Sequence, residues 1–208
     1  MGITIYASGR IGLIGDIARL IEDVKAIAEE SNWAHRILDD DFDEQPNAVL
    51  SGQGRDGSAA VIEGSLGLKG IIVSIDPGAE PLSILFDRSG TLTGIIEQLS
   101  WVQSNGQSER FTACKTQFGT IDTHIRIIEL LASLKDKYIT DLIVNDEGAY
   151  WETRDRRILA EKRIALGHCL RHTERVIGNI ESSGDEVLDP ETLAARIEQA
   201  LLKTDTSE

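Results

Sequence analysis

The sequence predicts an α+β fold, with a mixed, largely antiparallel sheet that is covered by helices and followed by a C-terminal helical extension. Three observations support this prediction. Short runs with strand character are joined by turn-rich links of a few residues, which favours antiparallel neighbours. Two amphipathic helical segments flank this block of strands. The repeated alternation of strand and helix that builds a doubly wound parallel sheet is missing.

The first part of the chain is expected to form a strand, a helix and a second strand. Residues 3–7 have strand character, and residues 13–30 repeat apolar side chains at the helical spacing. Residues 33–38 can return as a strand that leads into the acidic loop 39–44. Glycines 52, 54 and 57 mark a turn. The three strand-like runs that follow are 58–64, 70–76 and 82–87.

For the second part of the chain, the sequence predicts one strand, then a helix, a short strand and two further helices. Residues 91–108 give a mixed signal that predicts no single kind of element. Thr120 is a suitable N-cap for the helix at 121–138. The remaining elements are a strand at 110–118, a strand at 141–144, a long helix at 152–177 and a last helix at 190–203. One domain is therefore expected over residues 1–178, followed by a linker and a C-terminal helix over residues 179–208.

The composition limits the classes of protein. The 208 residues include 21 basic and 35 acidic side chains, which give a formal charge of −14. Such a charge repels phosphate backbones, so nucleic-acid binding is not expected. No apolar run approaches the roughly 20 residues that a bilayer span needs. No secretory signal is visible, and the two cysteines lie far apart in sequence and are best explained as reduced thiols. These two observations predict a cytoplasmic location.

Several sequence patterns resemble ligand-binding motifs but lack the spacing or the neighbouring elements that such motifs need. Glycines 9, 12 and 15 follow a strand but lack the spacing of a dinucleotide-binding loop, whereas the G-x-G-x-x-G at 52–57 precedes a strand instead of a helix. His168 and His172 share a helix face, but no further metal ligands stand at a suitable spacing. The acidic loop 39–44 does not have the order of a calcium-binding loop. No metal and no cofactor are expected.

A candidate site lies in the C-terminal half, where strand ends are expected to bring an amine, an imidazole, carboxylates and aromatic rings together. Such a group could transfer protons or bind a polar ligand. The candidate catalytic residues are Lys115, His124, Asp146 and Glu147, and the candidate ligand-binding residues are Gln117, Tyr150 and Trp151.

A structural interpretation of the same residues stays open. In this interpretation Asp146 and Glu147 form turn and N-cap hydrogen bonds. Tyr150 and Trp151 anchor the long helix, and Trp151 is largely buried. Lys115 then only neutralises a carboxylate.

The same region resembles a family of small bacterial α+β proteins. The resemblance rests on an ITIYASG-like start, KTQF at 115–118, a helix that begins near His124, KY at 137–138 and DEGAYWET at 146–153. It covers most of residues 1–160 and implies a bacterial single-domain protein. No activity is attached to that family, so the resemblance implies no catalytic role.

We expect a non-enzymatic protein-binding or regulatory protein. The sequence shows no nucleophile–base pair, no set of metal ligands and no phosphate-binding loop in the structural context that each of these sites needs. A specific version is an immunity-like or antitoxin-like protein whose acidic surface covers a partner with a basic surface. The basic helix at 152–177 and the acidic tail could also pair within one chain or across a homodimer. The alternative is a small hydrolase or polar-ligand-binding enzyme that uses the four candidate catalytic residues.

Overall fold

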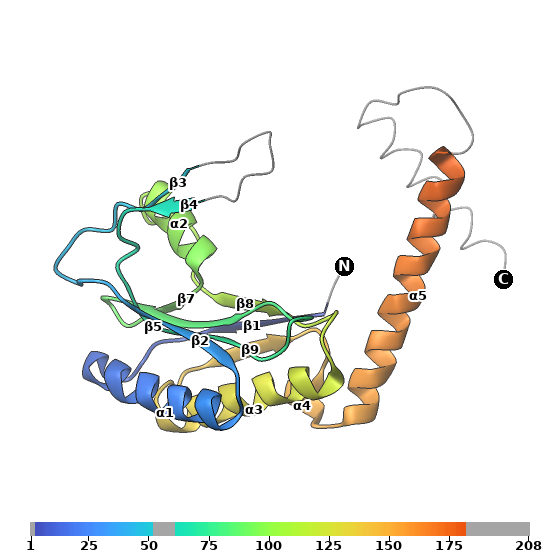
Figure 1. Cartoon of the computed structure of the whole chain (residues 1–208), viewed down its shortest axis with the longest axis horizontal. Helices are drawn as coiled ribbons and strands as arrows, with labels where there is room; N and C mark the ends of the chain where they lie inside the picture. The colour runs from blue at the N-terminus through green and yellow to red at the C-terminus, as the bar shows by residue number, and fades with distance from the viewer. Residues whose placement is uncertain (1–2, 52–60, 182–208) are drawn as a thin grey trace. The chain divides into compact units, whose positions relative to one another are not determined.

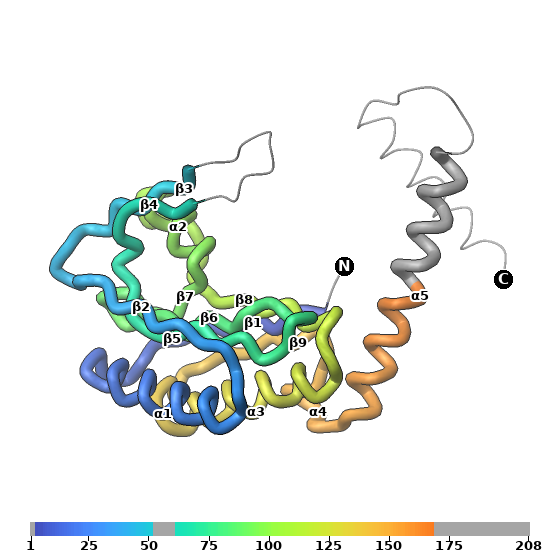
Figure 2. Tube along the Cα trace, viewed as in Figure 1, coloured from blue at the N-terminus to red at the C-terminus, as the bar shows by residue number. Residues whose placement is uncertain are grey.

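The computed structural model describes residues 3–51 and 61–181, with residues 169–181 as backbone only (Figure 1 and Figure 2). The described residues divide into two compact units, with the boundary between Leu159 and Ala160. The sequence places the end of its domain near residue 178, and the first compact unit ends at Leu159. This unit holds all the described strands, and its fold is α+β, as predicted.

The described elements are nine strands and five α-helices. The strands are β1 (Thr4–Ser8), β2 (Ala34–Asp39), β3 (Val49–Ser51), β4 (Val61–Glu63), β5 (Leu68–Ser74), β6 (Leu82–Asp87), β7 (Leu92–Thr93), β8 (Thr112–Lys115) and β9 (Ile143–Asp146). The helices are α1 (Ile17–Glu30), α2 (Ile95–Gln103), α3 (Ile121–Lys137), α4 (Tyr150–Thr153) and α5 (Arg156–Glu181), and a 3-10 turn at Ile14–Asp16 precedes α1. None of the described helices is long and apolar enough to cross a membrane.

The strands form three sheets instead of one mixed sheet. Their orders are β8-β1-β9, β2-β5-β6-β7 and β3-β4, and every strand pair among the described residues is antiparallel. A bridge between Arg10 and Thr91 connects the first sheet with the second. The strand β2 stands at the edge of the four-stranded sheet.

The main core lies between the sheets and the helices α1 and α3, which run along the same side of the sheets (Figure 1). Leu20 and Val24 of α1 and Ile128 of α3 are fully buried there, together with Ile71 and Phe86 from the four-stranded sheet. These helical side chains recur three or four residues apart, so one stripe of each helix faces the sheet. The prediction that these two helices cover the sheet is confirmed.

The helix α2 was not predicted, because its segment carries apolar side chains on more than one face. Leu99 packs into a second, smaller core on the other side of the four-stranded sheet, whereas Ile96 is largely exposed. The preceding Gly94 offers no side-chain cap. The buried Gln98 donates a hydrogen bond of 2.7 Å to the carbonyl of Leu66, which fixes α2 on this second core.

Several predicted boundaries change. The helix predicted at 152–177 is two helices, because Arg154 takes the left-handed conformation with φ of 52° and ends α4. The strand predicted at 141–144 continues to Asp146, and the strand predicted at 110–118 is limited to β8. The predicted N-cap is confirmed, since the Thr120 side chain accepts a hydrogen bond of 3.0 Å from the Thr123 N–H.

Two further predictions concern the glycine turn at 52–57 and the helix at 190–203. Both segments lie outside the described residues.

Candidate functional site

Two of the predicted catalytic residues meet, but they meet in the interior. His124 lies in the first turn of α3, and Asp146 ends β9; both side chains are buried. The His124 Nε2 atom lies 3.1 Å from the Asp146 carboxylate, and Nδ1 lies 2.8 Å from Oγ1 of the buried Thr116. A general base has to come within hydrogen-bond reach of the substrate. This enclosed imidazole has no such access.

The Asp146 carboxylate holds the following turn in place. It accepts hydrogen bonds from the backbone N–H groups of Gly148 at 2.7 Å, Tyr150 at 2.7 Å and Trp151 at 2.9 Å. Burial raises the pKa of Asp146, but the hydrogen bonds from His124 and from the backbone N–H groups outweigh burial, so the pKa lies below its ordinary value. Asp146 thus binds the first two backbone N–H groups of α4, as the structural interpretation of the sequence expects for this residue.

Lys115 and Glu147 lie apart from this buried pair. Lys115 is opposite Thr4 in the β1–β8 pairing, whereas Asp146 is opposite Ile5 in the β1–β9 pairing. Since successive side chains of β1 point to opposite faces, Lys115 and Asp146 are on opposite faces of the sheet. The exposed Glu147 accepts a hydrogen bond of 2.7 Å from the Thr4 N–H.

The aromatic candidates pack against the protein itself. Tyr150 and Trp151 are partly buried against the main core. The Arg154 guanidinium lies 5.9 Å from the Tyr150 ring centre and 4.9 Å from that of Trp151, and the Lys135 ammonium lies 5.7 Å from the Trp151 ring centre. The third ligand-binding candidate, Gln117, follows β8 and is partly buried. The rings therefore act as anchors for α4 with their faces covered by cations.

Four of the best-formed hollows of the described surface are lined by none of the seven candidate residues. No three His, Cys, Asp or Glu side chains within residues 3–51 and 61–168 are grouped so that they could hold a metal ion. Burial raises the pKa of Cys114 to about 12, so this thiol is not an activated nucleophile. The side chains of Cys169 and His172 lie outside the described residues.

The largest of these four hollows, with a volume of about 630 Å³, lies between α1 and β2. We call it the α1–β2 groove. It is lined by Ile14, Gly15, Ile17, Ala18, Ile21, Glu22, Ile37, Asp39, Asp41, Phe42, Asp43 and Lys69. The sequence predicts only a solvated acidic loop for residues 39–44, and it does not predict that this loop borders a hollow.

Exposed isoleucines line both sides of the α1–β2 groove. Ile14, in the 3-10 turn before α1, leaves 47% of its surface exposed, and Ile37 on β2 leaves 42% exposed. Ile17 and Ile21 lie between the groove and the main core. The apolar stripe of α1 is thus wider than the sheet that covers it, because the sheet ends at β2. Exposed apolar side chains that gather in a hollow are typical of binding sites.

We call the charged side chains that line the α1–β2 groove its rim; they are those of Glu22, Asp39, Asp41, Asp43 and Lys69. Four acids and one base line the groove, which gives a formal charge of −3. The base, Lys69, is held within the rim: its ammonium donates a hydrogen bond of 2.7 Å to Asp39 and lies 5.2 Å from the centre of the Phe42 ring. The hydrogen bond to Asp39 raises the pKa of Lys69, so this amine stays protonated.

A scan against protein-family models found no match, and neither a search of curated proteins nor a search of solved structures found a similar chain. The function therefore has to follow from the geometry. Among these four hollows, the α1–β2 groove combines exposed isoleucines with carboxylates and is the one best suited to bind another molecule.

Proposed function

We propose that this chain is a non-enzymatic protein-binding or regulatory protein that holds a basic partner in the α1–β2 groove. The observation that carries the proposal is the combination of half-exposed isoleucines with a rim of charge −3 in one hollow. Covering apolar surface contributes roughly 25 cal/mol per Å² before the losses of association are subtracted. The carboxylates select basic partners, because an acidic partner would leave like charges close together.

The net charge of the whole chain also favours a basic partner. A formal charge of −14 attracts basic proteins over distances longer than any contact, which speeds their association. Within this proposal, the specific role is that of an immunity-like or antitoxin-like protein in the bacterial cytoplasm, which covers a basic protein and blocks it. The enzymatic alternative has weaker support, since His124 and Asp146 are enclosed and Lys115 lies on the other face of the sheet.

Selection from a library of short random peptides on the immobilised full chain tests the proposal. We expect the selected peptides to combine Lys or Arg with aliphatic residues. The double substitution Asp41→Asn and Asp43→Asn should weaken their binding about tenfold, because each lost charge contact is worth up to about 1 kcal/mol and 1.4 kcal/mol is a factor of ten. The change at Asp41 is not expected to disturb the loop, since the oxygen of an asparagine side chain can still accept the hydrogen bond from the Asp43 backbone N–H.

The matched control removes two charges from exposed positions outside the groove, with Asp136→Asn and Glu152→Gln. Both double variants have the same net charge, so a general electrostatic effect would weaken binding equally in the two. Selected peptides without basic residues, or peptides that bind both variants equally well, would contradict the proposed function.

A further inference from the structure

The strand β2 offers a free sheet edge beside the groove. It pairs with β5 on one side, and no described strand pairs with it on the other. A free edge presents N–H and C=O groups to which another extended segment can bind. Peptide recognition by addition of a strand uses such an edge.

The pairing with β5 defines which residues of β2 face outward. Asp40, directly after β2, donates from its N–H to the Leu68 carbonyl at 3.1 Å, and the register continues without interruption along β2. Because the direction of the backbone groups alternates along a strand, His35, Ile37 and Asp39 direct their N–H and C=O groups away from β5.

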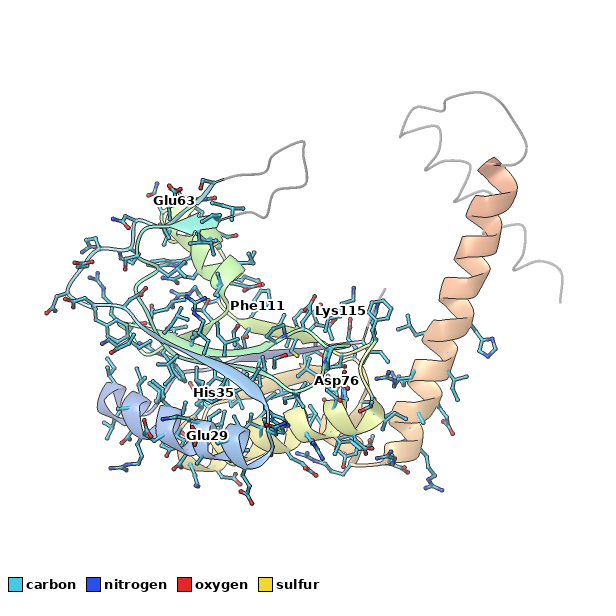
Figure 3. The ribbon with its side chains drawn as sticks, in the orientation of Figure 1. Glu29, His35, Glu63, Asp76, Phe111 and Lys115 are labelled. Atoms are coloured by element: carbon cyan, nitrogen blue, oxygen red, sulfur yellow. The ribbon has the colours of Figure 1, made fainter. Side chains whose placement is uncertain are left out.

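The side chains of the same three residues point towards the helical layer. Ile37 is opposite Ile71, and His35 is opposite Val73; both partners belong to the main core beneath the sheet. Figure 3 shows His35 on the side of β2 that faces α1. Ile37 and Asp39 themselves line the α1–β2 groove. The outward backbone groups and the groove-lining side chains therefore belong to the same residues.

A further strand beside β2 would lie about 4.8 Å away and would extend the sheet above α1. Every second side chain of that strand would then enter the α1–β2 groove, with the wall of α1 isoleucines on its far side. The groove thus has the position that a fifth strand of this sheet would cover.

We propose that the partner binds as an extended basic segment that pairs with β2 as an additional antiparallel strand. This inference rests on the proposed function and specifies its binding mode. The antiparallel direction follows the described pairs of this sheet and gives the slightly more stable ladder. In that direction a Lys or Arg opposite Asp39 comes two residues before an aliphatic residue opposite Ile37, and further basic residues before it meet Asp41 and Asp43.

The charge of the rim favours a basic partner over a second copy of the chain. Pairing two β2 edges would bring two rims of charge −3 together, in two chains that each carry −14. Charges at an edge strand are a common protection against pairing between identical edges. A basic segment instead neutralises the rim when it binds.

A designed peptide, Arg-Thr-Lys-Thr-Ile-Thr-Val, tests this mode with the full chain. In the proposed register the amides of its Lys and Ile face β2, and the amides of the Thr residues on either side of Ile face away. N-methylation of the Lys and Ile amides should weaken binding at least about tenfold, because it removes two ladder hydrogen bonds. N-methylation of those two Thr amides is the matched control and should leave the affinity nearly unchanged.

Amide hydrogen exchange of the protein gives a second, direct measurement. When the peptide binds, exchange at the outward amides of Ile37 and Asp39 should slow by at least about tenfold. The amides of Arg36 and Leu38 face β5 and serve as internal controls. No binding of the designed peptide, equal effects of the two methylation patterns, or unchanged exchange at Ile37 and Asp39 would overturn strand addition. The proposed function would still stand if selected basic peptides depended on Asp41 and Asp43, so the two failures can be distinguished.

Discussion

Asp146 shows how its surroundings turn a chemically reactive residue type into a structural one. A carboxylate offers about four lone-pair positions for hydrogen bonds. Asp146 uses its two oxygens for His124 and for three backbone N–H groups, those of Gly148, Tyr150 and Trp151. No acceptor position is left for a substrate, although an imidazole beside a carboxylate resembles a catalytic pair.

Asp146→Asn should therefore lower the stability of the fold. We expect the free energy of unfolding to fall by about 2–4 kcal/mol, because the amide places an N–H₂ group against backbone donors in a buried position. Urea denaturation of the full chain measures this change. Glu147→Gln is the neighbouring control: its exposed carboxylate accepts a hydrogen bond from Thr4, and its loss should cost about 1 kcal/mol or less. Equal losses in the two variants would contradict the special role of Asp146.

The lowered pKa of Asp146 also predicts how stability depends on pH. Its ordinary value is 3.8, and the folded value lies below it. A carboxyl group with a lowered folded pKa stabilises the fold above its unfolded pKa, and this contribution is lost as the pH falls through the folded pKa. Stability of the wild type should thus decline more steeply than that of Asp146→Asn as the pH is lowered from about 5 towards 2. Urea midpoints across this range measure the difference, and parallel curves would contradict the prediction.

At the scale of elements, the turn between β9 and α4 depends on a small residue at position 148. A Cβ atom on Gly148 would lie 2.7 Å from a methyl group of Leu159 and 2.9 Å from Cε1 of His124. Both distances are shorter than an ordinary van der Waals contact. Gly148 therefore lets α3, β9 and the start of α5 pack closely around the buried pair.

Gly148→Ala should destabilise the fold by about 1–3 kcal/mol through this overpacking. Gly15→Ala is a suitable control, because a Cβ atom there has no neighbour within 4 Å and alanine favours helical backbone. Thermal unfolding of both variants measures the difference. A Gly148→Ala protein as stable as the Gly15→Ala protein would show that the turn has room to adjust.

Elements with a clear period could be predicted from the sequence, whereas those that depend on tertiary contacts could not. Helix α3 and its N-cap Thr120 follow from local signals. The break after α4 does not, since Arg154 takes a conformation that non-glycine residues seldom adopt, and its guanidinium rests on the rings of Tyr150 and Trp151. For the candidate site, the closeness of His124 to Asp146 could be anticipated. The burial of this pair could not be anticipated, because burial depends on how α3 packs against the sheet.

At the scale of the whole molecule, the negative charge dominates long-range interactions. The α1–β2 groove was missed in the sequence because neither of its walls is a motif by itself. Ile14 belongs to the first turn before a helix, and Ile37 to a strand after it; only the folded chain places them around one hollow. The acidic residues were visible in the sequence, but their position beside an apolar surface was not.

The charge predicts that duplex DNA does not bind at physiological salt. Binding to DNA gains most of its free energy from the release of counterions by basic side chains, and a chain of charge −14 lacks this general attraction. Fluorescence anisotropy with a labelled duplex measures it. Submicromolar binding that weakens with salt would contradict the prediction and would point to the basic residues of α5.

While the protein is unbound, the free edge of β2 also affects its solubility. An exposed strand edge beside half-exposed isoleucines is a starting point for aggregation at the protein concentrations of a cell. The carboxylates of the rim oppose this process by repulsion between chains. The acids that we propose to attract a partner would therefore also keep the free chain dispersed, and selection for either property would preserve both.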